Sequence, residues 1–267
     1  MWQNRYIFPL EKVCVDYYKD AKLADTFSGL RYDHFAGPVV YRECHFCRYA
    51  STEVKEISMK KAKVFDTTLK DYLAQIGGID LASRADALGA TTAGGALIIA
   101  FYGIPHRISK EGVFKASGKT ANFTVSVVLC QYLLRCPQTI PAAGQWATYR
   151  EFKDAAPLSG WFTTNTNKII ETTFAGKLSA LETACRNAGG RLGQDTSFDL
   201  AVTFNFLPRI PVYLRFNDRD DEFPAQSSIL FRRSAEKYLD MECLAIGGTF
   251  LAGILVKGIA GSRRSTA

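Results

Sequence analysis

The stretch SFDLAVTFNFLPRIPVYLRF, residues 197–216, decides the fold class. Apolar residues alternate with polar or small ones before Pro208 and again after it, and this period of two is typical of half-buried β-strands. Pro211 lies inside the second run, which indicates either an edge strand or the first residues of a strand. We therefore expect two β-strands here, one on each side of Pro208.

Helices and further strands are expected around this pair. Ile229-Leu230-Phe231 is a short apolar strand candidate, and Ser234 and Asp240 are expected to cap the two helices that follow it. Periodicity and Gly or Pro stops predict further helices over residues 63–76, 80–88, 120–135, 168–174, 177–187 and 241–257, although the valines at 125, 127 and 128 leave a strand as the alternative for 120–135. Asp80 is expected to cap the helix at 80–88 and Gly89 to end it, and a small hairpin is expected around Lys110-Glu111. The sequence therefore predicts an α+β fold, with helices packed on one antiparallel or mixed sheet built from residues 96–102, 105–115, 197–206 and 210–216.

An acidic turn follows the second strand. It contains Asp218, Asp220, Asp221 and Glu222, with Arg219 among them. It is interpreted in three ways: a solvated turn held by Arg209 or Arg215, a corner that contacts a ligand or partner, or a magnesium or calcium site, since hard cations prefer oxygen ligands. The spacing does not match a calcium-binding loop.

Several short segments, taken together, resemble an uncharacterised domain-of-unknown-function family found mainly in anaerobic bacteria and archaea. These segments are PRIPV at 208–212, DDEFP at 220–224, ILF at 229–231, Tyr238-Leu239 and Glu242, with YLL at 132–134, GQW at 144–146 and YREF at 149–152 upstream. The resemblance covers about residues 59–257. It implies no assigned activity, although some members are joined to iron–sulfur modules. Arg232 and Cys243 stand where the family pattern has acidic residues, which weakens a metal-site role for this corner.

The first 58 residues differ from the rest of the chain. They contain 11 aromatic residues, and their eight basic residues balance eight acidic ones, so the net charge of +7 lies downstream. We expect a leader at 1–58, a single α+β domain at 59–260 and a frayed tail at 261–267. The leader is interpreted as an additional module, as disordered, or as a mis-assigned start in which translation begins at Met59.

The motif Cys44-His45-Phe46-Cys47 is the sharpest local pattern. Two thiolates at this spacing can hold one zinc or iron ion, because a tight turn brings both sulfurs to one point. Cys14, His34 and His45 are the further ligands nearby, and iron–sulfur clusters usually need a denser run of cysteines. We therefore expect that this motif binds no metal, and a zinc ion or an iron–sulfur cluster is the alternative.

The composition indicates the cellular compartment and limits the classes of binding partner. Seven cysteines form no regular framework, and no apolar signal segment follows the N-terminus, so a reducing cytoplasm is expected. The basic residues are scattered without a nucleic-acid module, so nucleic-acid binding is not expected. The apolar run 244–256 is shorter than the roughly 20 residues that span a bilayer, and we expect it to form a buried helix.

Catalytic patterns are weak. Downstream of Met59 the only histidine is His106, and the glycine-rich positions match neither a dinucleotide fingerprint nor a nucleophile elbow. The leading hypothesis is a cytoplasmic accessory or ligand-binding protein of anaerobic metabolism, with a small molecule or a protein as partner. The rival is an enzyme that uses Asp220, Asp221 and Glu222, with Arg209 or Arg215 as an anion anchor and Trp146 or Tyr149 lining a pocket.

Overall fold

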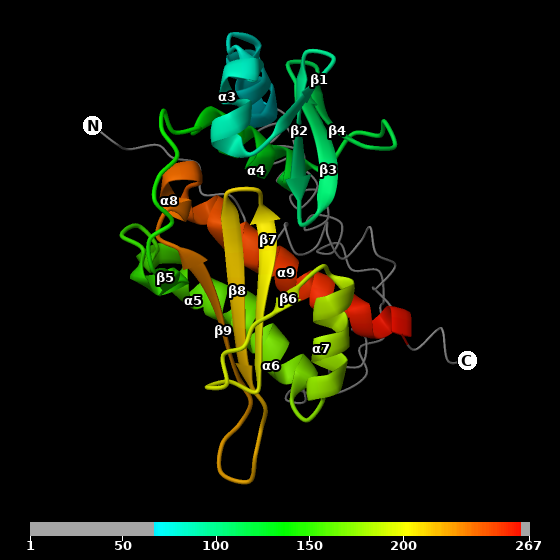
Figure 1. Ribbon diagram of the computed structural model, residues 1–267, viewed down its shortest axis with the longest axis vertical. Coiled ribbons are helices and arrows are strands. Elements are labelled where there is room, and N and C mark those ends of the chain that lie inside the picture. The colour runs from blue at the N-terminus through cyan, green and yellow to red at the C-terminus, as the bar shows by residue number, and fades with distance from the viewer. Residues whose placement is uncertain (1–66, 263–267) are drawn as a thin grey trace, which may run out of the picture. The chain divides into compact units, whose positions relative to one another are not determined.

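The computed structural model describes residues 67–262 (Figure 1). The chain divides into two compact units, Met1–Asp71 and Tyr72–Ala267, and the description below concerns the second. The predicted leader and the Cys44–Cys47 motif lie outside the described residues. Of the predicted tail, residues 261 and 262 continue the last helix and the others lie outside.

The strands form two antiparallel sheets. The four-stranded sheet has the order β1-β2-β3-β4, in sequence order, and the five-stranded sheet has the order β5-β9-β8-β7-β6. The strands are β1 Thr91–Ala93, β2 Ala96–Phe101, β3 Ile104–Ser109, β4 Gly112–Lys115, β5 Trp146–Thr148, β6 Arg191–Leu192, β7 Leu200–Leu207, β8 Ile210–Asn217 and β9 Gln226–Arg232. The α+β class is confirmed, whereas the prediction of one shared sheet is wrong.

The two sheets are joined at Tyr102, where β2 ends. Tyr102 has φ 46° and is followed by Gly103 with φ 77°, so the chain turns sharply into β3. The Tyr102 amide donates to the Phe206 carbonyl of β7 at 2.9 Å. Alternation along the sequence identifies strands but not their partners, which explains why the separation into two sheets was not predicted.

Pro211 is the second residue of β8, which lies between β7 and β9. The edge-strand alternative is therefore wrong, and the first-residue alternative is confirmed. Opposite Pro211 the β7–β8 pairing shifts register between Asn205 and Leu207. Such an irregularity accommodates a proline, because one ladder hydrogen bond is already missing there.

The predicted helices are present. They are α3 Leu81–Leu88, α4 Phe123–Leu134, α6 Lys168–Phe174, α7 Leu178–Asn187, α8 Ala235–Tyr238 and α9 Met241–Ser262, together with helical residues 67–77. The sequence did not predict α5 Ser159–Phe162 and the π-helical Thr163–Asn167 that continues it. This segment contains TTNTN, whose short polar side chains have low helix propensity, so tertiary packing decides its conformation.

The predicted caps have mixed outcomes. Asp80 caps α3, since its side chain accepts from the Ala82 amide at 3.0 Å, and Gly89 ends the same helix at φ 62°. Asp240 caps α9 by accepting from the Cys243 amide at 2.9 Å. The predicted Ser234 cap is wrong, because its side chain makes no cap hydrogen bond to α8. Helix α8 is a single turn, and its start is held by backbone contacts instead.

Helix α9 is the central helix of the core. Figure 1 shows it behind the five-stranded sheet, with α5, α6 and α7 on the same side. At 22 residues it is longer than the predicted apolar run. Met241–Gly258 is long and apolar enough to cross a membrane by length and composition alone, and 72% of this window is buried inside the fold. The prediction of a buried C-terminal helix is confirmed.

Candidate functional site

A cleft of about 650 Å³ opens beside the four-stranded sheet. One wall is the start of α3 with the chain before it, and the other is β3 with the β1–β2 and β3–β4 turns, which lie at the same end of the sheet. The lining residues are Ile76, Gly77, Ile79, Asp80, Leu81, Ala82, Thr92, Ala93, Gly94, Gly95, Ala96, Arg107, Ser109, Lys110 and Glu111. The volume is that of a small-molecule site.

Turn and cap residues shape this cleft. Asp80 is fixed at its helix wall by its capping hydrogen bond to α3. Gly94 and Gly95 form the β1–β2 turn with φ of 54° and 72°, which side-chain-bearing residues rarely adopt. A Cβ atom at either glycine would meet nothing within 4 Å, so the cleft mouth is open beside this turn.

Charged groups stand on both walls. Arg107, Lys110 and Glu111 come from the sheet wall, and Asp80 comes from the helix wall. The pKa of the Glu111 carboxyl is lowered mainly by the hydroxyl of Ser109, then by its own backbone amide and by the charges of Lys110 and Arg107. The sheet wall therefore carries two cations against one carboxylate, and the opposite wall carries one carboxylate.

His106 does not face this cleft. Along β3 it alternates with Arg107, so its ring lies on the core face, where it is 4% exposed and contacts Phe101 edge-on at 6.2 Å. Its Nδ1–H donates to the Ile104 carbonyl at 2.9 Å. Burial lowers the pKa of His106, so the ring is neutral near pH 7. The structure places it as a packed, hydrogen-bonded residue.

The acidic turn closes on itself at the tip of the β8–β9 hairpin. The Asp220 carboxylate accepts from the amides of Phe223 and Glu222 at 2.7 and 2.8 Å, and these bonds lower its pKa. Asp220, Asp221 and Glu222 are exposed, and none of them lines the cleft. Asp218 is tied to the fold through the Gly176 amide at 2.6 Å. Backbone amides, rather than Arg209 or Arg215, hold this turn.

Arg209 stands at the other end of β8, roughly 25 Å from the acidic turn at about 3.4 Å per residue. Its Nη2 donates to the Asp86 carbonyl in the last turn of α3 at 2.7 Å. A cation at a helix C-terminus is favourable because the free carbonyls carry partial negative charge. The structure therefore uses Arg209 to join α3 to the β7–β8 turn and does not bring it to the acidic turn or to His106.

Tyr149 and Trp146, three residues apart, lie in different environments. Tyr149 is 2% exposed, stacks on Phe162 at 4.3 Å and donates to the Met241 carbonyl at 2.7 Å. Trp146 is half-buried on the face of the five-stranded sheet that points away from α9. Tyr149 is thus a core residue, and of the two only Trp146 is available to a partner.

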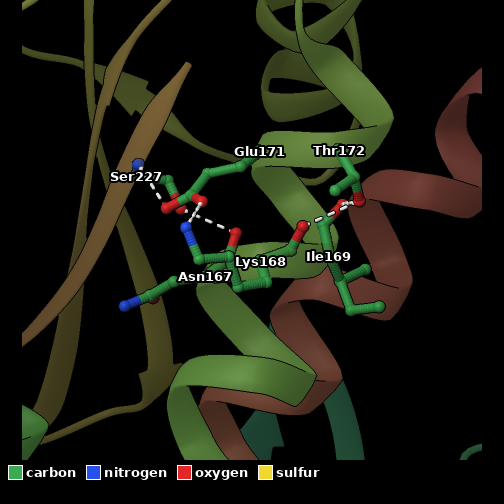
Figure 2. Close-up of polar contacts among 6 residues, drawn as sticks. All are labelled: Asn167, Lys168, Ile169, Glu171, Thr172 and Ser227. Carbon is green, nitrogen blue, oxygen red and sulfur yellow. Dashed lines mark hydrogen bonds and ion pairs between the residues drawn. The ribbon is translucent and has the colours of Figure 1, made fainter. Parts of the chain in front are cut away.

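A buried polar cluster supports the free edge of β9 (Figure 2). Strand β5 pairs only with residues 230–232, so the amide of Ser227 has no strand partner on that side. Glu171 of α6 replaces the strand: Oε1 accepts from the Ser227 amide at 3.1 Å, and Oε2 accepts from Lys168 Nζ at 2.6 Å. The Ser227 hydroxyl donates to the Asn167 carbonyl at 3.0 Å. Each of these contacts supports the fold.

The cysteines of the described residues are free. Cys130, Cys185 and Cys243 are buried, and burial raises the thiol pKa of Cys130 and Cys185 to about 12 and that of Cys243 well above its usual value. Cys136 is half-buried beside a loop. Within residues 67–262 no three His, Cys, Asp or Glu side chains are grouped to hold a metal ion. Cys44, Cys47, Cys14 and His45 lie outside this part, so the metal hypothesis for them stays a prediction.

The cleft was not predicted from the sequence. Asp80 was recognised only as a helix cap, Gly94-Gly95 only as a glycine pair before a strand, and Lys110-Glu111 only as the tip of a hairpin. Each residue has an ordinary local role, and the cleft arises where α3 packs against the sheet. The two glycines at a turn were the one available signal, and they do not indicate a ligand by themselves.

Comparison with known proteins assigns a family. A family model described as "Domain of unknown function (DUF3786)" matches residues 80–253. No curated protein and no solved structure gives a significant match to the chain. The matched range covers all of α3 through most of α9, including both sheets and most of the residues that line the cleft, so the chain belongs to this family.

Proposed function

We propose that this member of the family is a cytoplasmic accessory protein that binds a small zwitterionic molecule in the cleft beside α3. The observation that carries the proposal is the pairing of oppositely charged walls across a cleft of about 650 Å³. Arg107 and Lys110 would take a carboxylate or similar anion, and Asp80 would take an ammonium group. A role in anaerobic metabolism is part of the proposal and rests on the family resemblance alone.

The physical argument is one of matched charge above an apolar floor, with the charged side chains themselves exposed. Arg107 and Lys110 form no ion pair within 4 Å with a described residue, and the Asp80 carboxylate has only its capping bond to the Ala82 amide. Ile76 and Ala96 are 1% exposed and give the cleft an apolar floor. Charge-assisted hydrogen bonds are roughly twice as strong as neutral ones.

The free cysteines support the compartment. Cys130, Cys185 and Cys243 remain thiols in a packed core. Thiols persist where the cell is reducing, whereas secreted proteins usually pair them.

A thermal-shift panel tests the ligand class. The full chain is melted with free amino acids as zwitterions, with dicarboxylates and with diamines. A zwitterion at about 100 times its dissociation constant is expected to stabilise the protein by about 2.7 kcal/mol, and the singly charged classes are expected to do less. A shift with dicarboxylates alone, or with no class, contradicts the proposal.

Three variants locate the binding. Arg107→Gln removes the cation and Asp80→Asn removes the anion while keeping a residue that caps helices well. Each is expected to weaken the zwitterion roughly tenfold, the magnitude of one lost charge-assisted bond. Lys119→Gln removes an exposed cation from the loop between β4 and α4 and is expected to change nothing. Equal weakening by all three variants would indicate nonspecific charge effects.

A further inference from the structure

The outer face of the five-stranded sheet is built differently from its inner face. Residues that point inward along β7 and β8 are buried against α9 and its neighbours, among them Phe204, Phe206, Leu214 and Phe216. Figure 1 shows no labelled helix over the opposite face. Outward positions on the five strands include three arginines, Arg191, Arg215 and Arg232. They also include Tyr213, Ala201 and Leu230, which form a small buried cluster with Trp146 packed against it.

The aromatic rings and guanidinium groups on this face form a continuous ladder. Arg232 lies 4.1 Å from the ring centroid of its cross-strand partner Trp146. The Trp146 and Tyr213 rings are 5.2 Å apart and inclined by 34°. Arg215 lies 5.1 Å from the Tyr213 ring and 4.8 Å from that of Phe198. Stacking on a ring holds a guanidinium plane in a fixed orientation and leaves part of its N–H edge available.

Cations outnumber carboxylates on this face. None of the outward positions on β5 to β9 is Asp or Glu. Two carboxylates lie beside the face: Asp195 accepts from the Tyr213 hydroxyl at 3.1 Å, and Glu151 accepts from the Thr148 hydroxyl at 2.6 Å. Glu151 is also paired with Arg233 at 3.5 Å, so the three arginines leave the face positive. A positive face is complementary to an acidic partner.

We propose that this face docks an acidic, extended segment of a partner protein, with Arg215 and Arg232 as its two anchors. Guanidinium groups bind carboxylates through paired N–H donors, and a stacked guanidinium loses little further freedom on binding. Arg232 already donates one N–H to the Gly144 carbonyl at 3.0 Å. This bond holds the guanidinium group in place without neutralising its charge.

The register sets the spacing of the acidic residues. Arg215 pairs with Ser228, and Arg232 lies four residues further along β9. At about 3.4 Å per residue and about 4.8 Å between strands, the two Cα atoms are roughly 14 Å apart. An extended segment covers this distance in four residues, so its carboxylates are expected at positions i and i+4.

The ring contacts favour a protein over a nucleic acid. Single-stranded nucleic acids bind sheets by stacking bases on free aromatic faces. Here the Trp146 ring already contacts Arg232 and Tyr213, and Tyr213 is only 8% exposed. A carboxylate needs only the guanidinium edges. Arg215 and Arg232 are half-buried, and the Nε of Arg215 is buried without a hydrogen-bond partner among the described residues.

Peptide binding to the full chain tests the proposal. The probes are labelled twelve-residue Gly/Ser peptides with Asp at positions i and i+4, the same peptides with Asp at i and i+1, and an oligothymidylate of twelve nucleotides. Binding is followed by fluorescence anisotropy at low ionic strength. The i, i+4 peptide is expected to bind at least fivefold more tightly than the i, i+1 peptide and than the oligonucleotide. Preference for the oligonucleotide, or equal binding of both peptides, would overturn the proposal.

Variants assign the binding to this face. Arg215→Gln and Arg232→Gln are each expected to weaken the i, i+4 peptide roughly tenfold, and Arg232→Lys is expected to restore only part of the loss because an ammonium cannot form the paired contact. Lys119→Gln is the matched control on another surface. Thermal melting of each variant confirms that it is folded. If a folded Arg232→Gln binds the peptide as well as the wild type does, the docking surface is wrongly assigned.

Discussion

The two sheets of this protein are built by different kinds of interaction. The four-stranded sheet pairs each strand with its neighbour in sequence, through short turns at Gly94-Gly95, Tyr102-Gly103 and Lys110-Glu111. The five-stranded sheet also pairs β6 to β9 with their neighbours in sequence, but it takes its edge strand β5 from a distant part of the chain, and Glu171 supports the β9 edge beside it. Local turns determine the first sheet, whereas the second also depends on packing between segments that are distant in sequence.

The largest expected effect tests whether the two sheets unfold together. Phe206 is fully buried on β7, and its ring lies 5.3 Å from Phe101 and 5.1 Å from Tyr102 at the end of β2. Phe206→Ala is expected to cost about 3–5 kcal/mol, since it opens a cavity between the sheets. Urea unfolding gives the loss, and hydrogen exchange in β2 and β8 shows whether both sheets are affected.

The control for this prediction is Phe223→Ala. Phe223 is 60% exposed in the acidic turn, and its removal is expected to change stability by less than about 0.5 kcal/mol. Exchange that rises in β8 alone after Phe206→Ala would show that the four-stranded sheet is stable without the joint.

The next effect tests the packing of α9 on the five-stranded sheet. A Cβ atom at Gly247 would lie 2.5 Å from the Phe206 ring, so the helix approaches the sheet closely at this glycine. Gly247→Ala is expected to cost about 1–3 kcal/mol through overpacking, despite the better helix propensity of alanine. The loss is measured by chemical denaturation.

Gly160→Ala is the matched control. Gly160 is also helical, and a Cβ atom there would meet nothing within 4 Å. This substitution is expected to be neutral or to stabilise by up to about 1 kcal/mol. A neutral Gly247→Ala would mean that the ring of Phe206 moves aside and that the packing is looser than the distance indicates.

The same difference explains what the sequence predicts. Helix α3 was predicted at both ends because Asp80 and Gly89 are local signals, and the β3–β4 hairpin was predicted because its turn is short. Strands β5 and β6 have three and two residues, too few to show a period of two, and the partner of β5, strand β9, lies far along the chain. The separation into two sheets was missed for the same reason.

The candidate sites show the same difference between local signals and contacts made by distant segments. Trp146 was selected through the family resemblance, but its partner Arg232 is known only from the β5–β9 register. The cleft residues Asp80, Arg107 and Lys110 were not grouped, since α3 and β3 meet only in the folded protein. The acidic turn stood out in sequence because its charges are consecutive, and consecutive charges are usual in an exposed hairpin tip.

A smaller effect tests the edge support of the five-stranded sheet. Glu171→Ala removes the acceptor of the Ser227 amide and is expected to cost about 1–3 kcal/mol, the penalty for a buried donor left unsatisfied. Glu171→Gln keeps an acceptor and is expected to cost less. Urea unfolding of both variants separates the lost hydrogen bond from the lost charge.

Glu182→Ala is the control for Glu171→Ala. Glu182 pairs with Arg186 on the exposed face of α7 at 2.7 Å, and such pairs contribute about 0.5 kcal/mol or less. If Glu171→Ala costs no more than Glu182→Ala, water replaces the carboxylate at the β9 edge and the edge needs no side-chain support.

The smallest effect concerns pH and singles out the four-stranded sheet. Burial lowers the pKa of His106 below its ordinary value of 6.5, and the charge of Lys115 lowers it further, whereas the Ile104 carbonyl opposes both. The unfolded chain therefore binds more protons at this position than the folded protein does. Stability from this group is fully present above about pH 7 and is lost as the pH falls through 6.5 and below.

His106→Gln cannot take up this proton, so its free energy of unfolding should change less between pH 7.5 and 5.5 than that of the wild type. The measurement is urea unfolding of both proteins at each pH, in which the carboxylates and the remaining histidines contribute equally to both. Equal pH dependence in the two proteins would show that the folded His106 accepts its proton freely. In that case the four-stranded sheet would open to water at β3 more readily than its packing indicates.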